Sequence, residues 1–220
     1  MPRLNWDVIG ERYYETGVDH GVFFPMQDGA YGAGVPWNGL TAVTENPSGA
    51  EASPHYADNI KYLNLMSAEE FGATVEAFTY PPEFGEALGE REVAPGVIVT
   101  QQTRKPFGFS YRTKIGNDTE SIDYGYKLHL VYNAMAGVSD RAYNTINETP
   151  EPMGLSWEIT TTPVEAPGMK PTAHLIIKST TADPTALAAL EDILYGTEDV
   201  ESRLPMPAEV IELLKGEMGA

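Results

Sequence analysis

Alternating hydrophobic and polar positions are the clearest pattern along this chain, and they predict β-strands. In 107–114, aromatic or β-branched residues take the odd positions, while small or basic residues take the even ones. The same period of two recurs in 156–161 and, less cleanly, in 127–132, and segments 73–80 and 172–179 are also rich in β-forming residues. Such a period places one face of a strand in a core and the other in water, so we expect antiparallel, half-exposed strands.

Helical spacing of apolar residues is found near the end of the chain. Asp183 is suited to cap a helix, and Pro184 is suited to its first turn. Leucines then repeat at helical spacing over 187–194, and Gly196 follows. The sequence therefore predicts a helix there. A second short helix is expected over 208–215, which is preceded by prolines and followed by a glycine.

Glycine and proline are frequent between the predicted strands, and two stretches show no regular period. Residues 21–59 read as a long Gly/Pro-rich loop that contains Phe23 and Trp37, and 80–96 reads as an acidic loop. Long loops in compact domains are often ordered by a partner, and exposed aromatic residues are enriched at interfaces. Phe23 and Trp37 are therefore expected either to contact a neighbouring subunit or to plug the ends of this domain's own core.

The composition is that of one folded domain over 1–220, because 42% hydrophobic residues can fill a core and 21% charged residues can cover it. We divide it into an N-terminal arm (1–20), the loop region (21–59), a β core (60–182) and a helical C-terminal region (183–220). The N-terminus has no signal-peptide pattern, and no stretch has about 18 consecutive apolar residues. We therefore expect a chain that stays in solution and has no membrane partner.

Charge is unevenly distributed. The net charge is −18, yet residues 101–150 carry +1 while the segments on either side are strongly acidic. Such a surface repels nucleic acid and anionic lipid. Two interpretations of the basic segment remain open: its cations contact acidic surface on a second copy, or they pair with acids of their own chain. The candidate inter-subunit residues are Arg104, Lys105, Arg112 and Lys114.

Motifs for catalysis, cofactors and metals were not found. The four histidines are far apart in sequence, and no His-x-x-x-His or Glu-x-x-His spacing joins them. The glycines between 29 and 34 are not followed by Lys-Ser or Lys-Thr, and no Gly-x-Ser-x-Gly is present. We therefore expect a protein that is not an enzyme and that has no cofactor or metal site.

Several segments, taken in order, resemble the major tail proteins of long-tailed bacteriophages. They are DVIGERYYETGV (7–18), WNGLTAVTE (37–45), YADNIKY (56–62), EFGATVEA (70–77), YRTKIGNDTE (111–120) and SWEITTTP (156–163). The resemblance extends nearly end to end, and it rests on the number and order of the segments rather than on any catalytic signature.

This resemblance implies a mainly β fold, an antiparallel β-sandwich or barrel-like tail-tube domain with one or two short helices, a long loop and an N-terminal arm. It implies a structural protein of the virion tail that assembles in the host cytoplasm as hexameric rings stacked into a tube. The implied partners are further copies, the tape-measure protein, tail-completion proteins and, in transit only, double-stranded DNA. The family offers no catalytic residues to transfer.

Two glutamates are candidates for the inner wall of such a tube. Glu76 and Glu158 each have apolar neighbours one position to either side, as a water-facing residue of a half-buried strand should. We hypothesise that they make the lumen negative, so that DNA passes without binding. The alternative class of function is a monomeric β-sandwich module that binds carbohydrate or protein through Tyr31 and Trp37.

Overall fold

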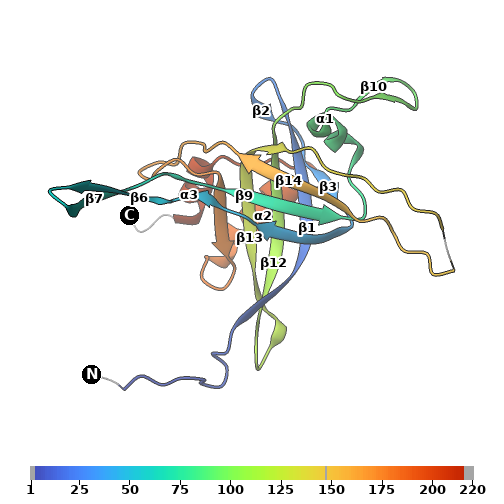
Figure 1. Ribbon diagram of the computed structural model, residues 1–220. Coiled ribbons are helices and arrows are strands. Elements are labelled where there is room, and N and C mark those ends of the chain that lie inside the picture. Colours follow the sequence, from blue (N-terminus) through green and yellow to red (C-terminus); the bar gives the residue numbers. More distant parts are fainter. Residues whose placement is uncertain (1–2, 147, 216–220) are drawn as a thin grey trace.

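The computed structural model describes residues 3–146 and 148–215, and a large antiparallel sheet forms its centre (Figure 1). Its strands follow the order β2-β1-β12-β13-β14-β9-β4, with β15 added beside β13 and β3 beside β1. The bounds are β1 (Tyr14–Gln27), β2 (Ala30–Tyr31), β3 (Val35–Trp37), β4 (Leu40–Glu45), β9 (Gly72–Ala77), β12 (Phe107–Asn117), β13 (Ser121–Ala136), β14 (Leu155–Thr161) and β15 (His174–Lys178). The predicted mainly β, antiparallel fold is confirmed.

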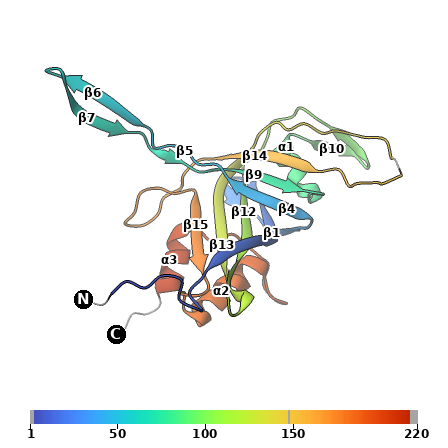
Figure 2. The ribbon, with the colours of Figure 1, turned by 60° about the horizontal axis from the view of Figure 1, so that its bottom comes forward.

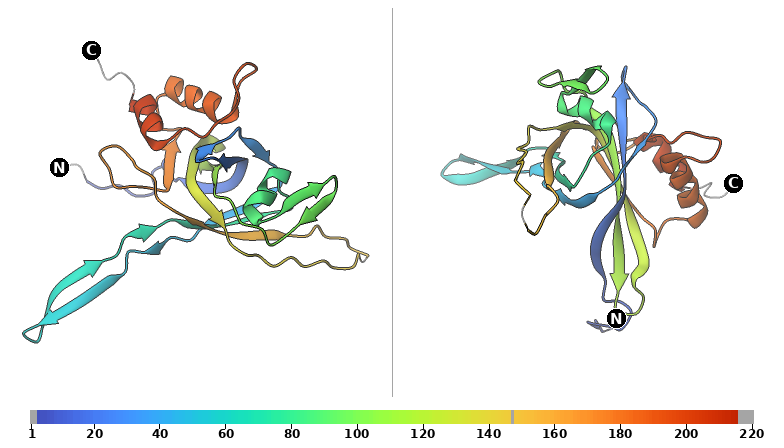
Figure 3. Two further views of the ribbon diagram at one scale, coloured as in Figure 1. Left: turned by 90° about the horizontal axis from the view of Figure 1, so that it is seen from above. Right: turned by 90° about the vertical axis from the view of Figure 1, so that its right-hand side faces the viewer.

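The sheet is strongly curved and has a hydrophobic core on each face (Figure 3). Successive residues of β1 show this directly, because Phe23 belongs to one core and Phe24 to the other. The sheet curls until β4 meets β1: a Cβ added to Gly21 of β1 would lie 2.3 Å from Leu40 Cδ1 of β4. The inner core is therefore enclosed in a barrel-like manner.

Two helices, α2 (Pro184–Tyr195) and α3 (Pro207–Lys215), pack on the outer face of the sheet against β1, β13 and β15 (Figure 3). The predicted cap is confirmed, since the Asp183 carboxylate accepts hydrogen bonds from the amides of Thr185 and Ala186 at 3.0 and 2.9 Å. Gly196 follows the last turn. Among the described residues, no helix has the length and apolar character needed to cross a membrane.

The expected loop over 21–59 is a wrong prediction, because most of it is strand. It contains the second half of β1 and all of β2, β3 and β4, and the chain is already extended from Tyr14, inside the expected N-terminal arm. Gly29 and Gly39 lie in turns between these strands rather than inside a long loop. Gly29 and Gly39 have φ of +83° and +78°, a region that glycine adopts without strain.

The acidic loop expected over 80–96 is also more structured than predicted. A 3₁₀ turn (Pro82–Phe84) runs into the short helix α1 (Gly85–Leu88), and Phe84 is completely buried in the inner core. A small hairpin follows, made of β10 (Arg91–Ala94) and β11 (Val97–Val99). The apolar Phe84 anchors this segment, although the surrounding glutamates make it look solvated in the sequence.

Between β4 and β9 the chain leaves the sheet as a projecting two-stranded segment, residues 46–71, which we call the arm (Figure 2). Short strands β5 (Ser48–Gly49) and β8 (Glu69–Glu70) pair at its root, and β6 (Ala52–Ala57) pairs with β7 (Ile60–Met66) farther out. Asp58 and Asn59 turn the chain at its tip, both with positive φ. This backbone conformation suits the two-residue turns of β-hairpins.

Candidate functional site

The projecting segments carry most of the large apolar side chains that face solvent. On the arm, Tyr56 and Tyr62 are both 70% exposed, and every residue of β6 and β7 is exposed. Other exposed apolar residues lie on the N-terminal segment, on the β10–β11 hairpin and in the loop after β13. Together they include Leu4, Trp6, Ile9, Tyr56, Ile60, Tyr62, Leu65, Met66, Val93, Ile98, Val138, Tyr143 and Ile146.

The arm cannot bury these side chains by itself. Within the part of the chain that the structure describes, it is a ribbon of two strands with no sheet or helix packed on either face, and a ribbon of this kind is marginally stable alone. Its outer edges also present unpaired backbone groups that favour pairing with another chain. The arm therefore has the properties of a surface that a partner completes.

The two candidate lumen residues lie together on the outward face of neighbouring strands. Glu76 of β9 is the register partner of Ser156 on β14, and Glu158 of β14 is the partner of Thr74 on β9. Both glutamates are exposed, while Val75 and Trp157 point into the inner core. The alternation that suggested water-facing positions is confirmed, and a lining role stays a prediction.

Three of the four candidate basic residues bond within their own chain. Arg104 donates to the backbone carbonyls of Ala136 and Gly137, and Lys105 pairs with Glu86 at 2.7 Å. Arg112 forms two hydrogen bonds with Asp19. These three therefore form the intramolecular bonds that one of the two interpretations expected, and their contact with a second copy stays a prediction.

Lys114 differs from the other three. Its side chain is half-buried on β12 and has no hydrogen bond or ion pair within residues 3–146 and 148–215. It is therefore the member of the set that retains an ammonium group available for a neighbouring copy.

Phe23 and Trp37 are core residues, so of the two expectations the structure agrees with packing in this domain's own core and corrects the one of contact with another subunit. They are 1% and 3% exposed, and their rings meet edge to face at 6.4 Å between centroids. The Trp37 indole Nε1–H donates to the carbonyl of Thr79 at 3.0 Å. A binding platform of Tyr31 and Trp37 is likewise not formed, because Trp37 is buried and the Tyr31 hydroxyl accepts a hydrogen bond from the Asn133 amide.

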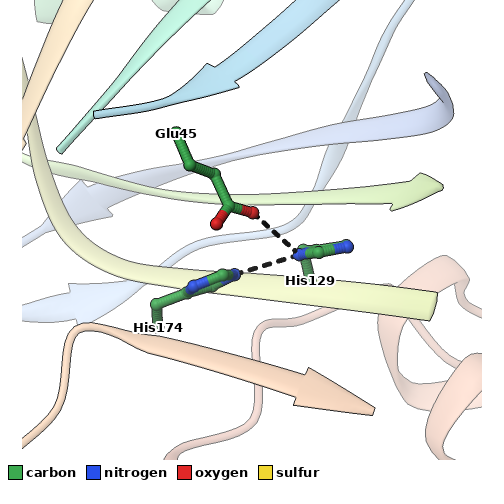
Figure 4. A group of neighbouring side chains, drawn as sticks. All are labelled: Glu45, His129 and His174. Carbon is green, nitrogen blue, oxygen red and sulfur yellow. Dashed lines mark hydrogen bonds and ion pairs between the residues drawn. The ribbon is translucent and has the colours of Figure 1, made fainter. Parts of the chain in front are cut away.

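A cluster that the sequence analysis missed joins Glu45, His129 and His174 (Figure 4). His129 Nδ1 lies 3.1 Å from His174 Nε2 and 3.4 Å from Glu45 Oε1. The three residues come from β4, β13 and β15. His129 is 4% exposed and is therefore a buried member of the cluster.

Aromatic and hydroxyl groups hold this cluster in place. The His129 ring stacks on Tyr111 with centroids 4.4 Å apart, and its Nε2 lies 3.0 Å from Thr113 Oγ1. Tyr111 Oη donates to Glu45 Oε1 at 2.9 Å, and the His174 ring lies against Phe71. The side chains are thus fixed by neighbours on both sides.

Burial determines the protonation of the cluster. It lowers the pKa of His129 to about 3, with further lowering by the nearby His174 and Lys127, and it also lowers the pKa of His174. Burial together with the Glu45 charge raises the pKa of the Tyr111 hydroxyl. At neutral pH both imidazoles are therefore uncharged, and Tyr111 keeps the proton that it donates to Glu45.

Comparison with known proteins gives neither a family nor a named relative. No protein-family model and no curated protein matches the chain. Solved structures that resemble it include chains of an anti-feeding prophage baseplate and of an extracellular contractile injection system. A chain of the anti-feeding prophage baseplate is 9% identical, with a TM-score of 0.38, over 79% of this chain and 97% of that one. A chain of the PVC sheath–tube complex in its extended state is 12% identical, with a TM-score of 0.30, over 80% of this chain and 93% of that one.

A chain from the PVC sheath/tube terminator is similar at 12% identity and a TM-score of 0.25, over 80% of this chain and 99% of that one. Similarity at this level does not assign a function. The function of this chain is therefore argued from its own residues and surfaces.

Proposed function

We propose that the chain is a structural subunit of a phage tail tube, which assembles as stacked hexameric rings. The observation that carries the proposal is the arm, a fully exposed ribbon with apolar side chains that projects from a domain with two buried hydrophobic cores. Leaving such a ribbon in water is unfavourable, so a partner that covers it gains free energy. The resemblance of several segments to major tail proteins is the reason for proposing stacked hexameric rings rather than another assembly.

The partner that suits the arm is another copy of the chain. A ribbon edge can pair with a strand of a neighbour through main-chain hydrogen bonds, and Tyr62 and Leu65 can then pack on the neighbour's apolar surface. Apolar residues on the N-terminal segment and on the β10–β11 hairpin provide complementary surfaces at other ends of the same molecule. Contacts between different surfaces of identical copies generate rings and stacks.

Charge supports a role in which DNA passes without being held. The chain carries a net charge of −18, and Glu76 and Glu158 lie on one exposed face. In our proposal this face lines the lumen, where it repels the phosphate backbone. Lys114 meets acidic surface of an adjacent copy, and the tape-measure and tail-completion proteins are the remaining partners.

Assembly can be tested with the purified chain by negative-stain electron microscopy and sedimentation velocity over a range of concentrations. We expect rings or tubes that become more abundant as the concentration rises. A variant with Tyr62→Ser and Leu65→Ser should remain folded by circular dichroism, because neither residue belongs to a core, yet it should sediment as a small species.

The matched control carries Met169→Ser and Val200→Ser, two exposed apolar residues outside the projecting segments, and should assemble like the unmodified chain. If the unmodified chain stays monomeric at every concentration, or if the arm variant assembles normally, the arm is not an assembly element. A monomer would instead favour the alternative of a binding module.

A further inference from the structure

We propose that Glu45, His129 and His174 form a binding site for a divalent transition-metal ion, with Zn²⁺ as the ion that the donor set suits best. Two imidazole nitrogens and a carboxylate oxygen face one another at the root of the arm. This set of ligands is one that zinc sites with an open coordination position use. The inference does not depend on assembly, since one chain supplies all three ligands.

The distances fit an ion at the centre of the cluster. Zinc bonds to nitrogen and oxygen are about 2.0–2.1 Å long, so two ligand atoms of a tetrahedral site lie roughly 3.3 Å apart. In the structure, the separations from His129 Nδ1 are 3.1 Å to His174 Nε2 and 3.4 Å to Glu45 Oε1. All three donor atoms lie within 4.8 Å of one another.

Neighbouring groups prepare the ligands. Thr113 Oγ1 contacts Nε2 of His129, which fixes the ring and leaves Nδ1 directed toward the ion. Tyr111 Oη bonds to the Glu45 carboxylate and orients it. Such outer partners are characteristic of metal sites because they set the tautomer and the direction of each ligand.

Access is available from one side. The His129 side chain is 5% exposed, whereas that of Glu45 is 41% exposed, so an ion can enter beside the carboxylate while the buried His129 ring closes the inner side. The fourth coordination position then faces the same opening and takes water.

The site would tie the root of the arm to the sheet. Glu45 is the last residue of β4 before the arm begins, and Phe71, the residue that ends the arm, lies against His174 at 4.2 Å between centroids. β13 and β15 supply the histidines. A bound ion therefore cross-links the base of the arm to two strands of the main sheet.

A hydrogen bond between the two imidazoles is the competing explanation of the cluster, since one nitrogen can donate to the other at 3.1 Å without any ion. The two explanations differ in their response to metal. The tag-free chain, stripped with a chelator, is titrated with Zn²⁺ by isothermal calorimetry, and its thermal unfolding is followed by circular dichroism.

We expect one saturable site per chain and a rise in Tm of roughly 5–10 °C when free Zn²⁺ is about 100-fold above Kd. Glu45→Gln and His174→Gln should each weaken binding about tenfold or more, while the control His55→Gln, an exposed histidine on β6, should leave it unchanged. Co²⁺ added to the unmodified chain should give visible absorption bands of a nitrogen- and oxygen-ligated ion, a readout that needs no variant.

The proposal is overturned if Zn²⁺ gives neither saturable heat nor a shift in Tm. It is also overturned if His55→Gln weakens binding as much as His174→Gln does, because the ion would then sit on surface histidines.

Discussion

The guanidinium of Arg112 and the carboxylate of Asp19 face each other across β12 and β1 and form a two-point ion pair, with nitrogen–oxygen distances of 2.6 and 3.0 Å. The two residues are direct register partners in the sheet. Arg112 also lies over the Tyr126 ring, 5.0 Å from its centroid. A cation that the sequence offered as an inter-subunit contact thus joins two strands of its own sheet.

Removing this pair should destabilise the monomer. We expect Arg112→Gln to lower the free energy of unfolding by roughly 1–3 kcal/mol, because it leaves a partly buried carboxylate without its charged donors. Urea denaturation followed by circular dichroism measures the change. Lys114→Gln on the same strand is the matched control, since it removes an equal charge but no bond within the described chain, and equal losses in both variants would refute the role of the pair.

The same pair predicts a dependence of stability on pH. Hydrogen bonding from Arg112 is the main cause that lowers the pKa of Asp19 below its ordinary value, and the charge of Arg112 lowers it further. A carboxyl with a lowered pKa contributes stability above its unfolded-state pKa of about 3.9 and loses that contribution as pH falls through the folded-state value. Asp19→Asn should therefore cost stability at pH 7 and progressively less below about pH 4. A cost that stays constant from pH 7 to pH 3 would contradict this.

Local patterns and long-range pairing differ in how far the sequence reveals them. Which residues of β14 face the core was predictable from the alternation of apolar and polar residues, and the start of α2 was predictable from Asp183-Pro184. Both signals depend only on residues that are close in sequence. The strands within 21–59 were missed, although Asp28-Gly29 and Asn38-Gly39 are the strongest short-range hairpin signals a sequence offers. Those turns return the chain to the sheet and carry its aromatic residues into the core.

The candidate sites also differ in whether a local sequence pattern or long-range strand pairing determines them. Exposure of Glu76 and Glu158 followed from the strand period, which needs no knowledge of partners. The cluster of Glu45, His129 and His174 could not be predicted, because its members come from three strands whose neighbours are set by the folded sheet. Spacing in sequence carries no information about ligands that meet only through such pairing.

Helix α2 should depend on its cap. Asp183→Ala removes the acceptor of two amide hydrogen bonds and should lower the free energy of unfolding by about 1 kcal/mol. Asp183→Asn keeps a capping oxygen and should retain most of the stability. Chemical denaturation of both variants tests this, and equal losses would mean that the cap contributes nothing beyond its charge.

Two buried tryptophans should respond differently to loss of the indole nitrogen. Trp37 donates its Nε1–H to the Thr79 carbonyl, whereas Nε1 of Trp157 is buried without a hydrogen-bond partner in the part of the chain that the structure describes. Phenylalanine removes the nitrogen in both cases and leaves a smaller ring in the same inner core. We expect Trp37→Phe to cost about 1 kcal/mol more than Trp157→Phe, because it also breaks a bond. Thermal and urea unfolding measure the difference, and the reverse order would show that cavity volume dominates.

Charge reversal on the proposed lumen face should convert a tube that does not bind DNA into one that does. Glu76→Lys and Glu158→Lys place cations on adjacent strands of one exposed face, repeated in every copy of the assembly. Assembled variant tubes should then bind short duplex DNA at low salt, and the affinity should fall steeply as salt rises, because binding releases condensed counterions.

The matched control is Glu198→Lys with Asp199→Lys, which changes the net charge equally at exposed positions beyond α2. Fluorescence anisotropy at several salt concentrations compares the two tubes with the unmodified one. Binding only by the Glu76 and Glu158 variant supports a lumen lined by this face. Equal binding by both variants would show that net charge, not position, governs the interaction, and tight binding by the unmodified tube would refute a lumen that repels DNA.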